Sequence, residues 1–177
     1  RLSFSIEGIQ AGDSIVGHKI YFPKEIKVRS FREYKDALRK MKVVIDQEER
    51  RKMILNQIGR KLATLKATLH PDEDLLERLV YDIEYPHVIL GSFPEEYLDL
   101  PLEVLSTAMR EGQKLFSIVK EKKQRPFFLG VADAYQDSKS LIRKGNERVL
   151  RARLEDAKFF WEQDRRITLR DKAKGLD

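Results

Sequence analysis

The sequence contains no cysteine, only one tryptophan and only three histidines. Without cysteine the chain has no disulfide, no thiolate metal ligand and no cysteine nucleophile. Absence of cysteine is typical of proteins kept in a reducing compartment, so we expect a cytoplasmic location. No apolar run approaches the roughly 18 residues of a membrane-spanning helix, and no signal-peptide pattern is present. We therefore expect no membrane partner.

The residue patterns of common catalytic sites are also missing. There is no glycine-rich phosphate loop, no paired His-x-x-x-His, no GxSxG and no HExxH. His18, His70 and His87 lie far apart in sequence without a base-orienting partner, and a lone histidine is usually structural. We therefore expect no catalytic residue, no metal ligand and no cofactor site in this chain taken alone.

Charge is what the sequence has in excess. Charged residues make up 36% of the 177 residues, against roughly 25% in an ordinary domain. The net charge is +6, but 35 basic residues are interspersed with 29 acidic ones. This balance permits a polyanionic partner without requiring one. Hydrophobic residues make up 41%, which is enough for the core of one domain. The first residue is Arg1 rather than methionine, so we expect a piece of a longer polypeptide.

Alternating and β-branched apolar runs predict several strands, and their number and spacing indicate an α+β fold. We expect a mostly antiparallel sheet covered by helices. His87–Phe93 is continuously apolar, which favours a central strand over a water-facing edge. Leu115–Val119 and Pro126–Ala132 are predicted as a hairpin joined by the charged loop Lys120–Arg125. The other predicted strands are Leu2–Ile9, Lys19–Phe22 and Lys42–Ile45.

Helices are predicted from capping residues and apolar periodicity. Capping boxes at Ser30 and at Asp46 start two helices, of which the second is long, about residues 47–69. Two more are expected at Asp72–Ile83 and at Leu102–Glu111, the latter ended by a left-handed Gly112. The first of these two should turn its apolar residues inward, namely Leu75, Leu76, Leu79, Val80 and Ile83. The first helix should turn Phe31, Tyr34, Leu38 and Met41 inward. The long helix should have a basic outer face, which is either solvated or follows a phosphate backbone. The residues of that face are Glu49, Arg50, Arg51, Lys52, Arg60, Lys61 and Lys66.

The segment Gly145–Arg166 is predicted as one amphipathic helix capped by Asn146. Its inner face should carry Leu150, Leu154, Ala157 and Trp161, widened by Val149 and Phe160. Two interpretations of its outer arginines, Arg148, Arg151 and Arg153, are open. In the first interpretation they are solvated and form the pairs Glu147–Arg151 and Arg151–Glu155, each of which stabilises the helix by about 0.2–0.5 kcal/mol. Alternatively, their planar forks hold phosphates or carboxylates.

Two segments resemble the β subunit of the bacterial-type heterotetrameric glycyl-tRNA synthetase. The first is Tyr85–Val119, with its Gly-Ser-Phe strand, its Leu-Pro step and the motif Met-Arg-x-x-Gln-Lys-x-Phe at 109–116. The second is the helix at 145–165, GNERVLRARLEDAKFFWEQDR. AGDSIVGHKIYFP and VVIDQEERRKMI are similar to upstream parts of that subunit. Gly112 departs from the family, which often has His or another polar residue there, and Leu115 stands where Tyr is usual.

The resemblance runs to about Arg166, so we expect one α+β domain over residues 1–166 followed by a tail at 167–177. Thr168–Lys172 is similar to a family segment that normally lies well downstream. Either this chain is shorter there, or a stretch of the family sequence is missing between Arg166 and Thr168.

The resemblance also implies fold and function. The fold should be related to the editing-type domain of the phenylalanyl-tRNA synthetase β subunit. The α subunit activates glycine with ATP and Mg, and the β subunit supplies tRNA recognition and architecture. We therefore expect a non-catalytic fragment of a cytoplasmic glycine–tRNA ligase of protein biosynthesis. Its partners would be tRNA(Gly), the α subunit and the rest of the β subunit.

The residues that would contact tRNA phosphates are Arg110, Lys114, Lys144, Arg148, Arg151 and Arg153. The alternative is that these cations form internal ion pairs that fix helices to the sheet. Two other functions also stay open: a free-standing RNA-binding module and a hydrolytic editing-type domain. The missing nucleophile and base argue against the hydrolytic one.

Overall fold

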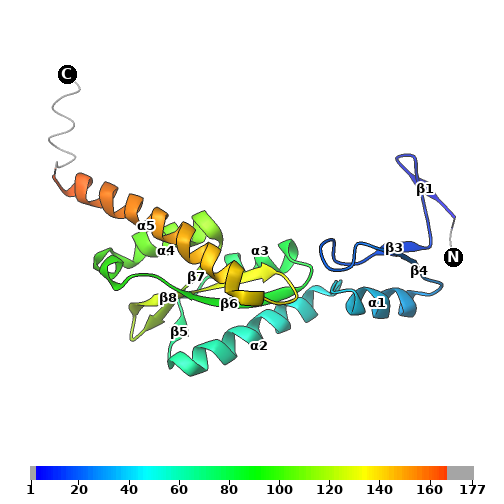
Figure 1. Cartoon of the computed structure of the whole chain (residues 1–177), viewed down its shortest axis with the longest axis horizontal. Coiled ribbons are helices and arrows are strands. Elements are labelled where there is room, and N and C mark those ends of the chain that lie inside the picture. The colour runs from blue at the N-terminus through cyan, green and yellow to red at the C-terminus, as the bar shows by residue number, and fades with distance from the viewer. Residues whose placement is uncertain (1–2, 167–177) are drawn as a thin grey trace, which may run out of the picture.

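The computed structural model describes residues 3–166. Its main sheet is fully antiparallel, with strand order β5-β7-β8-β6, and a helical layer covers each face (Figure 1). The α+β class predicted from the sequence is confirmed. The sheet consists of β5 (Thr68–Leu69), β6 (Pro86–Ser92), β7 (Leu115–Lys120) and β8 (Lys123–Asp133). Two small hairpins precede it, β1 (Ser5–Ile6) with β2 (Ile9–Gln10) and β3 (Ser14–Val16) with β4 (Glu25–Lys27).

Five α-helices and two short 3-10 turns complete the described part of the chain. They are α1 (Phe31–Lys40), α2 (Gln47–Leu65), α3 (Glu73–Asp82), α4 (Leu102–Gln113), α5 (Leu141–Arg166), η1 (Glu95–Asp99) and η2 (Ser138–Ser140). The small hairpins and α1 lie together to one side of the sheet, and α2 connects them to it (Figure 1).

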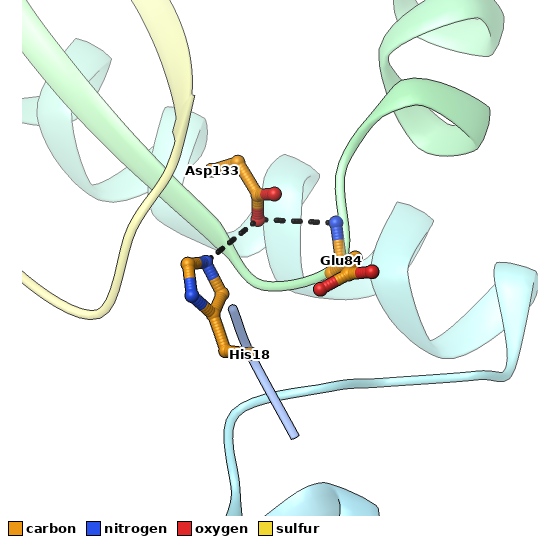
Figure 2. A group of neighbouring side chains, drawn as sticks. All are labelled: His18, Glu84 and Asp133. Atoms are coloured by element: carbon orange, nitrogen blue, oxygen red, sulfur yellow. Dashed lines mark hydrogen bonds and ion pairs between the residues drawn. The ribbon is translucent and has the colours of Figure 1, made fainter. Parts of the chain in front are cut away.

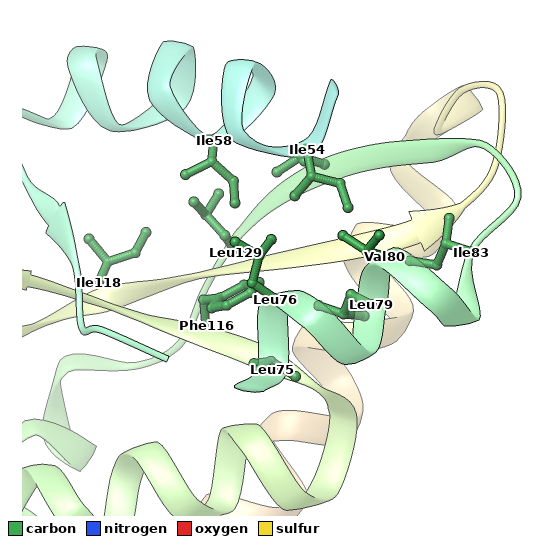
Figure 3. Close-up of a cluster of buried hydrophobic side chains, with 11 residues drawn as sticks. Ile54, Ile58, Leu75, Leu76, Leu79, Val80, Ile83, Phe116, Ile118 and Leu129 are labelled. Carbon is green, nitrogen blue, oxygen red and sulfur yellow. The ribbon is translucent and has the colours of Figure 1, made fainter. Parts of the chain in front are cut away.

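One core lies between the sheet and the pair α2 and α3 (Figure 3). From α2, Ile54 and Ile58 are one turn apart and almost fully buried. The apolar face predicted for Asp72–Ile83 is confirmed, since all five of its apolar residues are buried. Burial of this many aliphatic side chains, at about 1.5–3 kcal/mol each, is the main source of stability on this face. The members are Ile54, Ile58, Leu75, Leu76, Leu79, Val80, Ile83, Val88, Phe116, Ile118 and Leu129.

The second core lies on the opposite face, under α4 and α5. Leu150 and Leu154 of α5 are fully buried, as predicted, and Ala157 and Trp161 are partly buried beside them. Val149 and Phe160 were predicted to widen this face, but they are 41% and 64% exposed. The cause is geometric, because α5 contacts α4 and the sheet along one narrow line of apolar residues. The other buried members are Phe93, Tyr97, Leu100, Leu105, Met109, Leu115 and Phe128.

Of the three strands predicted before residue 50, the first is correct only in part and the other two are wrong. Within Leu2–Ile9, residues 5–6 and 9 are extended, but the chain reverses at Glu7-Gly8, where both residues have positive φ, and forms the exposed β1–β2 hairpin; Leu2 lies outside the described residues. Lys19–Phe22 is a turn in which the N–H groups of Tyr21 and Phe22 both donate to the carbonyl of His18. Lys42–Ile45 has no ladder, because Lys42 is left-handed (φ 60°) and breaks the extended run. β-Branched composition alone does not supply the pairing partner that a strand needs.

The prediction that His87–Phe93 is a central strand is also wrong, because β6 pairs only with β8 and lies at an edge. Its apolar character comes from coverage on both faces, by α2 and by α5. Its free edge is closed by side chains. Gln57 of α2 donates to the carbonyl of Pro86 (2.9 Å) and accepts from the N–H of Val88 (3.0 Å), and Glu147 accepts from the N–H of Ser92 (3.1 Å).

Helix ends follow local capping in some places and tertiary contacts in others. Ser30 and Asp46 cap α1 and α2 as predicted, through the N–H groups of Glu33 and Glu49. The helix predicted over about 47–69 ends at Leu65, where Lys66 becomes left-handed (φ 48°), and Thr68–Leu69 joins the sheet instead. Within α1, Leu38 is buried, but Phe31 was wrongly placed inward and is 71% exposed.

Two predicted helix ends on the α4–α5 face are wrong. Gly112 lies inside α4, and the left-handed residue is Lys114 (φ 54°). Asn146 lies inside α5, which starts at Leu141 because the carboxylate of Asp137 accepts the N–H groups of Ile142 (2.8 Å) and Arg143 (3.1 Å).

Candidate nucleic-acid interface

Three of the predicted site residues form one basic stripe on α5. Lys144, Arg148 and Arg151 are spaced by four and three residues, which places them on the same helical face. All three are exposed, and none forms an ion pair or side-chain hydrogen bond with another residue of the range 3–166. We call these three residues the α5 stripe.

The α5 stripe borders a surface depression of about 480 Å³. Arg148 and Arg151 line it from α5, and the chain leaving β6 lines it from the other side. The remaining lining residues are Ser92, Phe93, Pro94 and Glu147. The size suits a small anionic group, and two guanidinium groups beside a backbone turn can supply several N–H donors to it.

The carboxylate of Glu147 is already used by other donors. It accepts the backbone N–H of Ser92 (3.1 Å) and the guanidinium of Arg143 (3.2 Å), so it fixes α5 to the end of β6. The pairs predicted between Glu147 and Arg151 and between Arg151 and Glu155 are therefore not formed. Glu155 instead accepts the hydroxyl proton of Tyr97 (3.3 Å). Burial raises the pKa of Tyr97, and the Glu155 carboxylate raises it further.

Arg153 is separated from the other two arginines. Its side chain crosses α4 at Gly112, where an added Cβ would come within 2.7 Å of its Cδ and 2.8 Å of its Nε. Gln113 strengthens the same crossing by donating to the side-chain oxygen of Asn146 (3.0 Å). The location of Arg153 favours a structural role at the α4–α5 crossing.

Arg110 and Lys114 connect α4 to both ends of α3. The Nε of Arg110 lies 2.8 Å from the carboxylate of Asp72, which is the N-cap of α3. The Nζ of Lys114 lies 2.6 Å from the carboxylate of Asp82, the last residue of α3. The Asp72 carboxylate raises the pKa of Arg110, and the hydrogen bond from Lys114 lowers the pKa of Asp82. This geometry favours internal ion pairs for both cations.

His18 lies in a second cluster of titratable groups, with Glu84 and Asp133 (Figure 2). Its Nε2 is 3.5 Å from a carboxylate oxygen of Asp133, which also accepts the N–H groups of Glu84 (3.1 Å) and Tyr85 (2.8 Å). Its Nδ1 accepts the N–H of Ile20 (3.3 Å). A metal-bound imidazole needs the reverse, a second nitrogen that donates. The cluster therefore serves to hold the His18 loop against the sheet.

One residue of the basic face predicted on α2 is misplaced. Arg50 is 8% exposed and donates to the carbonyls of Val80 (2.8 Å) and Val44 (2.5 Å). A guanidinium that joins two buried carbonyls is a structural clamp. The sequence predicted an outer position from the charge of Arg50, because its two carbonyl acceptors lie six and thirty residues away along the chain and leave no local signal.

The whole chain, residues 1–177, matches the family model described as glycyl-tRNA synthetase beta subunit. The chain belongs to the glycyl-tRNA synthetase beta subunit family. Glycine–tRNA ligase beta subunits of Trichlorobacter lovleyi and Syntrophus aciditrophicus are 40% and 38% identical over 98% and 99% of this chain. That of Geobacter sulfurreducens is 38% identical over 98%. The chain spans about a quarter of the length of these relatives, 25% to 26%.

Family membership confirms the resemblance found at Tyr85–Val119 and at residues 145–165. In this β-subunit segment those two stretches meet in space, because the N–H of Ser92, the last residue of β6 in the first stretch, donates to the carboxylate of Glu147 on α5 in the second. The sequence contained both motifs but no signal for their contact. Ser92, Phe93, Pro94 and Glu147 were therefore missed as site residues. The tail predicted at 167–177 lies outside the described residues, and none of the helices within 3–166 is long and apolar enough to cross a membrane.

Proposed function

We propose that this glycyl-tRNA synthetase β-subunit segment contributes to tRNA(Gly) binding and to subunit architecture. In this proposal it acts within a cytoplasmic glycine–tRNA ligase whose α subunit activates glycine with ATP and Mg, and the rest of the β subunit completes the enzyme. The names of the relatives and the family match support the assignment.

The observation that carries the tRNA contact is the α5 stripe. Lys144, Arg148 and Arg151 place three positive charges on one face without a carboxylate partner among residues 3–166, beside a depression of about 480 Å³. Phosphate oxygens can enter such a site and accept paired N–H bonds from arginine. Contacts of this kind give affinity and register rather than base identity.

The test is the double variant Arg148→Gln/Arg151→Gln, titrated with a tRNA(Gly) transcript at several salt concentrations. If each arginine neutralises one phosphate, the slope of log affinity against log salt should fall by about 1.4–1.8, with a several-fold weaker Kd at low salt.

The matched control is Arg29→Gln/Arg32→Gln, which also removes two exposed guanidinium groups, both outside α5. It should change the salt slope by much less than the α5 double variant does. An unchanged slope in the α5 variant, with both variants folded by circular dichroism, would contradict the phosphate role.

A further inference from the structure

The turn between β7 and β8 concentrates positive charge at one end of the sheet. Residues 120–125 read Lys-Glu-Lys-Lys-Gln-Arg, so four cations and one carboxylate occupy six positions. None of the four cations has an ion pair or side-chain hydrogen bond with the described part of the chain, and all are exposed. The hairpin lies at the end of the molecule opposite β3, β4 and α1 (Figure 1).

The tip extends beyond both neighbouring strands. On one side β6 ends at Ser92, which pairs with Phe127, so residues 123–125 have no partner in β6. On the other side β5 begins at Thr68, which pairs with Val119. The tip is therefore a two-stranded ribbon open on both sides. Lys66, which precedes β5 by two residues and is exposed, adds a fifth cation near its base.

The local sequence of this turn is unfavourable for stability. Glu121 and Lys122 both have positive φ, 52° and 64°. A two-residue turn of this kind prefers Asn-Gly, and a left-handed residue with a Cβ costs roughly 1 kcal/mol. Lys120 and Lys123 are directly opposite in the ladder, where like charges repel. Departures from local preference in both backbone and charge are expected at functional or strained sites.

The charge of the tip indicates the class of ligand. Four cations along an open ribbon, with no apolar residue among positions 120–125, offer long donors and no surface for hydrophobic packing. A protein partner normally needs an apolar centre in its interface. A run of phosphates needs only the cations, because released counterions supply the free energy.

We propose that the β7–β8 tip, residues 120–125, binds the phosphate backbone of RNA at a place separate from the α5 stripe. This rests on the proposed function, because tRNA is the RNA that such an enzyme would hold. The two groups of cations lie at the same end of the sheet but on different elements. The stripe is on α5 and borders the end of β6, where the N–H of Phe93 donates to the carbonyl of Pro126, whereas the tip continues β7 and β8 beyond that contact.

The test is the variant Lys120→Gln/Lys122→Gln/Lys123→Gln/Arg125→Gln, titrated as the 177-residue chain with a tRNA(Gly) transcript across salt concentrations. Loss of two to four phosphate contacts should lower the salt slope by about 1.4–3.6 and weaken the Kd at least tenfold at low salt. A matched variant, Lys19→Gln/Lys24→Gln/Lys27→Gln/Lys40→Gln, removes the same net charge from exposed positions at the opposite end. It should change the slope far less.

A second variant separates the strained backbone from the charge. Glu121→Asn/Lys122→Gly removes one negative and one positive charge and installs the preferred turn sequence. It should raise the unfolding midpoint while leaving the salt slope within about one contact of the parent. Equal slopes in the four-glutamine variant and the parent would overturn the tip contact, and if Arg148→Gln/Arg151→Gln still lowered the slope, the proposed function would stand. Absence of tRNA binding by the parent chain would overturn both.

Discussion

Gly91 and Gly59 show how differently two glycines constrain this chain. At Gly91, on β6, an added Cβ would come within 2.1 Å of Cζ of the fully buried Phe128. At Gly59, on the exposed face of α2, it would meet no atom within 4 Å. Gly91 is therefore a packing requirement of the core under α4 and α5, whereas Gly59 only weakens its helix.

We predict that Gly91→Ala lowers the free energy of unfolding by about 2 kcal/mol, because Phe128 has no free space to move into. Gly59→Ala should raise it by about 1 kcal/mol through helix propensity and a less flexible unfolded chain. Urea unfolding of the two variants beside the parent measures both effects. A Gly91→Ala variant as stable as the parent would show that the ring can shift and that the packing argument fails.

Some single residues were predictable from the sequence because the cause is local. Ser30 and Asp46 were identified as caps because an N-cap contact spans only three residues. Gly112 was misread as a helix end, although its physical requirement is the passing side chain of Arg153, forty-one residues later. No local rule distinguishes a glycine that permits a left-handed turn from one that permits a close crossing.

At the scale of elements, α3 was predicted in full and β6 only in part. All apolar residues predicted inward on α3 are buried, because helical periodicity needs one neighbouring surface and nothing else. The apolar run of β6 correctly indicated burial on both faces but not its position at the sheet edge. That edge is closed by Gln57 and Glu147, and hydrogen bonds over thirty-one and fifty-five residues leave no periodic signal.

The ion pair between α3 and α4 makes a prediction about acid. The pKa of Asp82 is held below its ordinary value of 3.8 by Lys114. A lowered folded pKa means that the stabilisation is fully present above the unfolded pKa and is lost as pH falls through the folded pKa. Asp82→Asn should therefore be less stable than the parent at pH 7, and this difference should shrink as pH falls below about 3.8.

Urea midpoints of the parent and Asp82→Asn at pH 7 and at about pH 2.5 measure that difference. The control is Glu77→Gln, on the exposed face of the same helix and without a hydrogen bond or ion pair to residues 3–166. Its difference from the parent should be small at both pH values. A difference for Asp82→Asn that stays constant with pH would mean that the pair with Lys114 does not stabilise the fold.

Across the whole molecule, the six candidate cations divide according to contacts that only the fold determines. Lys144, Arg148 and Arg151 share a face because they share α5, whereas the sequence grouped Arg148 and Arg151 with Arg153 and placed Lys144 before the helix. Arg110 and Lys114 meet carboxylates thirty-eight and thirty-two residues away at the two ends of α3. Whether a basic residue is a surface charge or an internal clamp depends on such distant partners, so the sequence alone left both interpretations open.

The role of Arg50 also depends on distant partners, which attach the N-terminal part of the chain to the sheet. Its guanidinium joins the carbonyl of Val44, just after α1, to that of Val80 in α3, and the N–H of Val44 donates to the carbonyl of Glu84. Each hydrogen bond from a charged donor contributes about 1.5–3 kcal/mol, and its loss leaves a buried carbonyl without a donor. Arg50 therefore attaches the segment that runs from β1 to α1 to the sheet domain.

We predict that Arg50→Met, which keeps much of the aliphatic volume, lowers the free energy of unfolding by about 3 kcal/mol. Hydrogen exchange at the amides of His18 and Val44 should speed up more than exchange in β7 and β8, because the N-terminal part should open before the sheet. Lys52→Met, at an exposed position of the same helix, is the control and should change neither quantity appreciably. If Arg50→Met loses stability but exchange rises equally in the sheet and at Val44, Arg50 supports the whole core rather than the attachment of the N-terminal part.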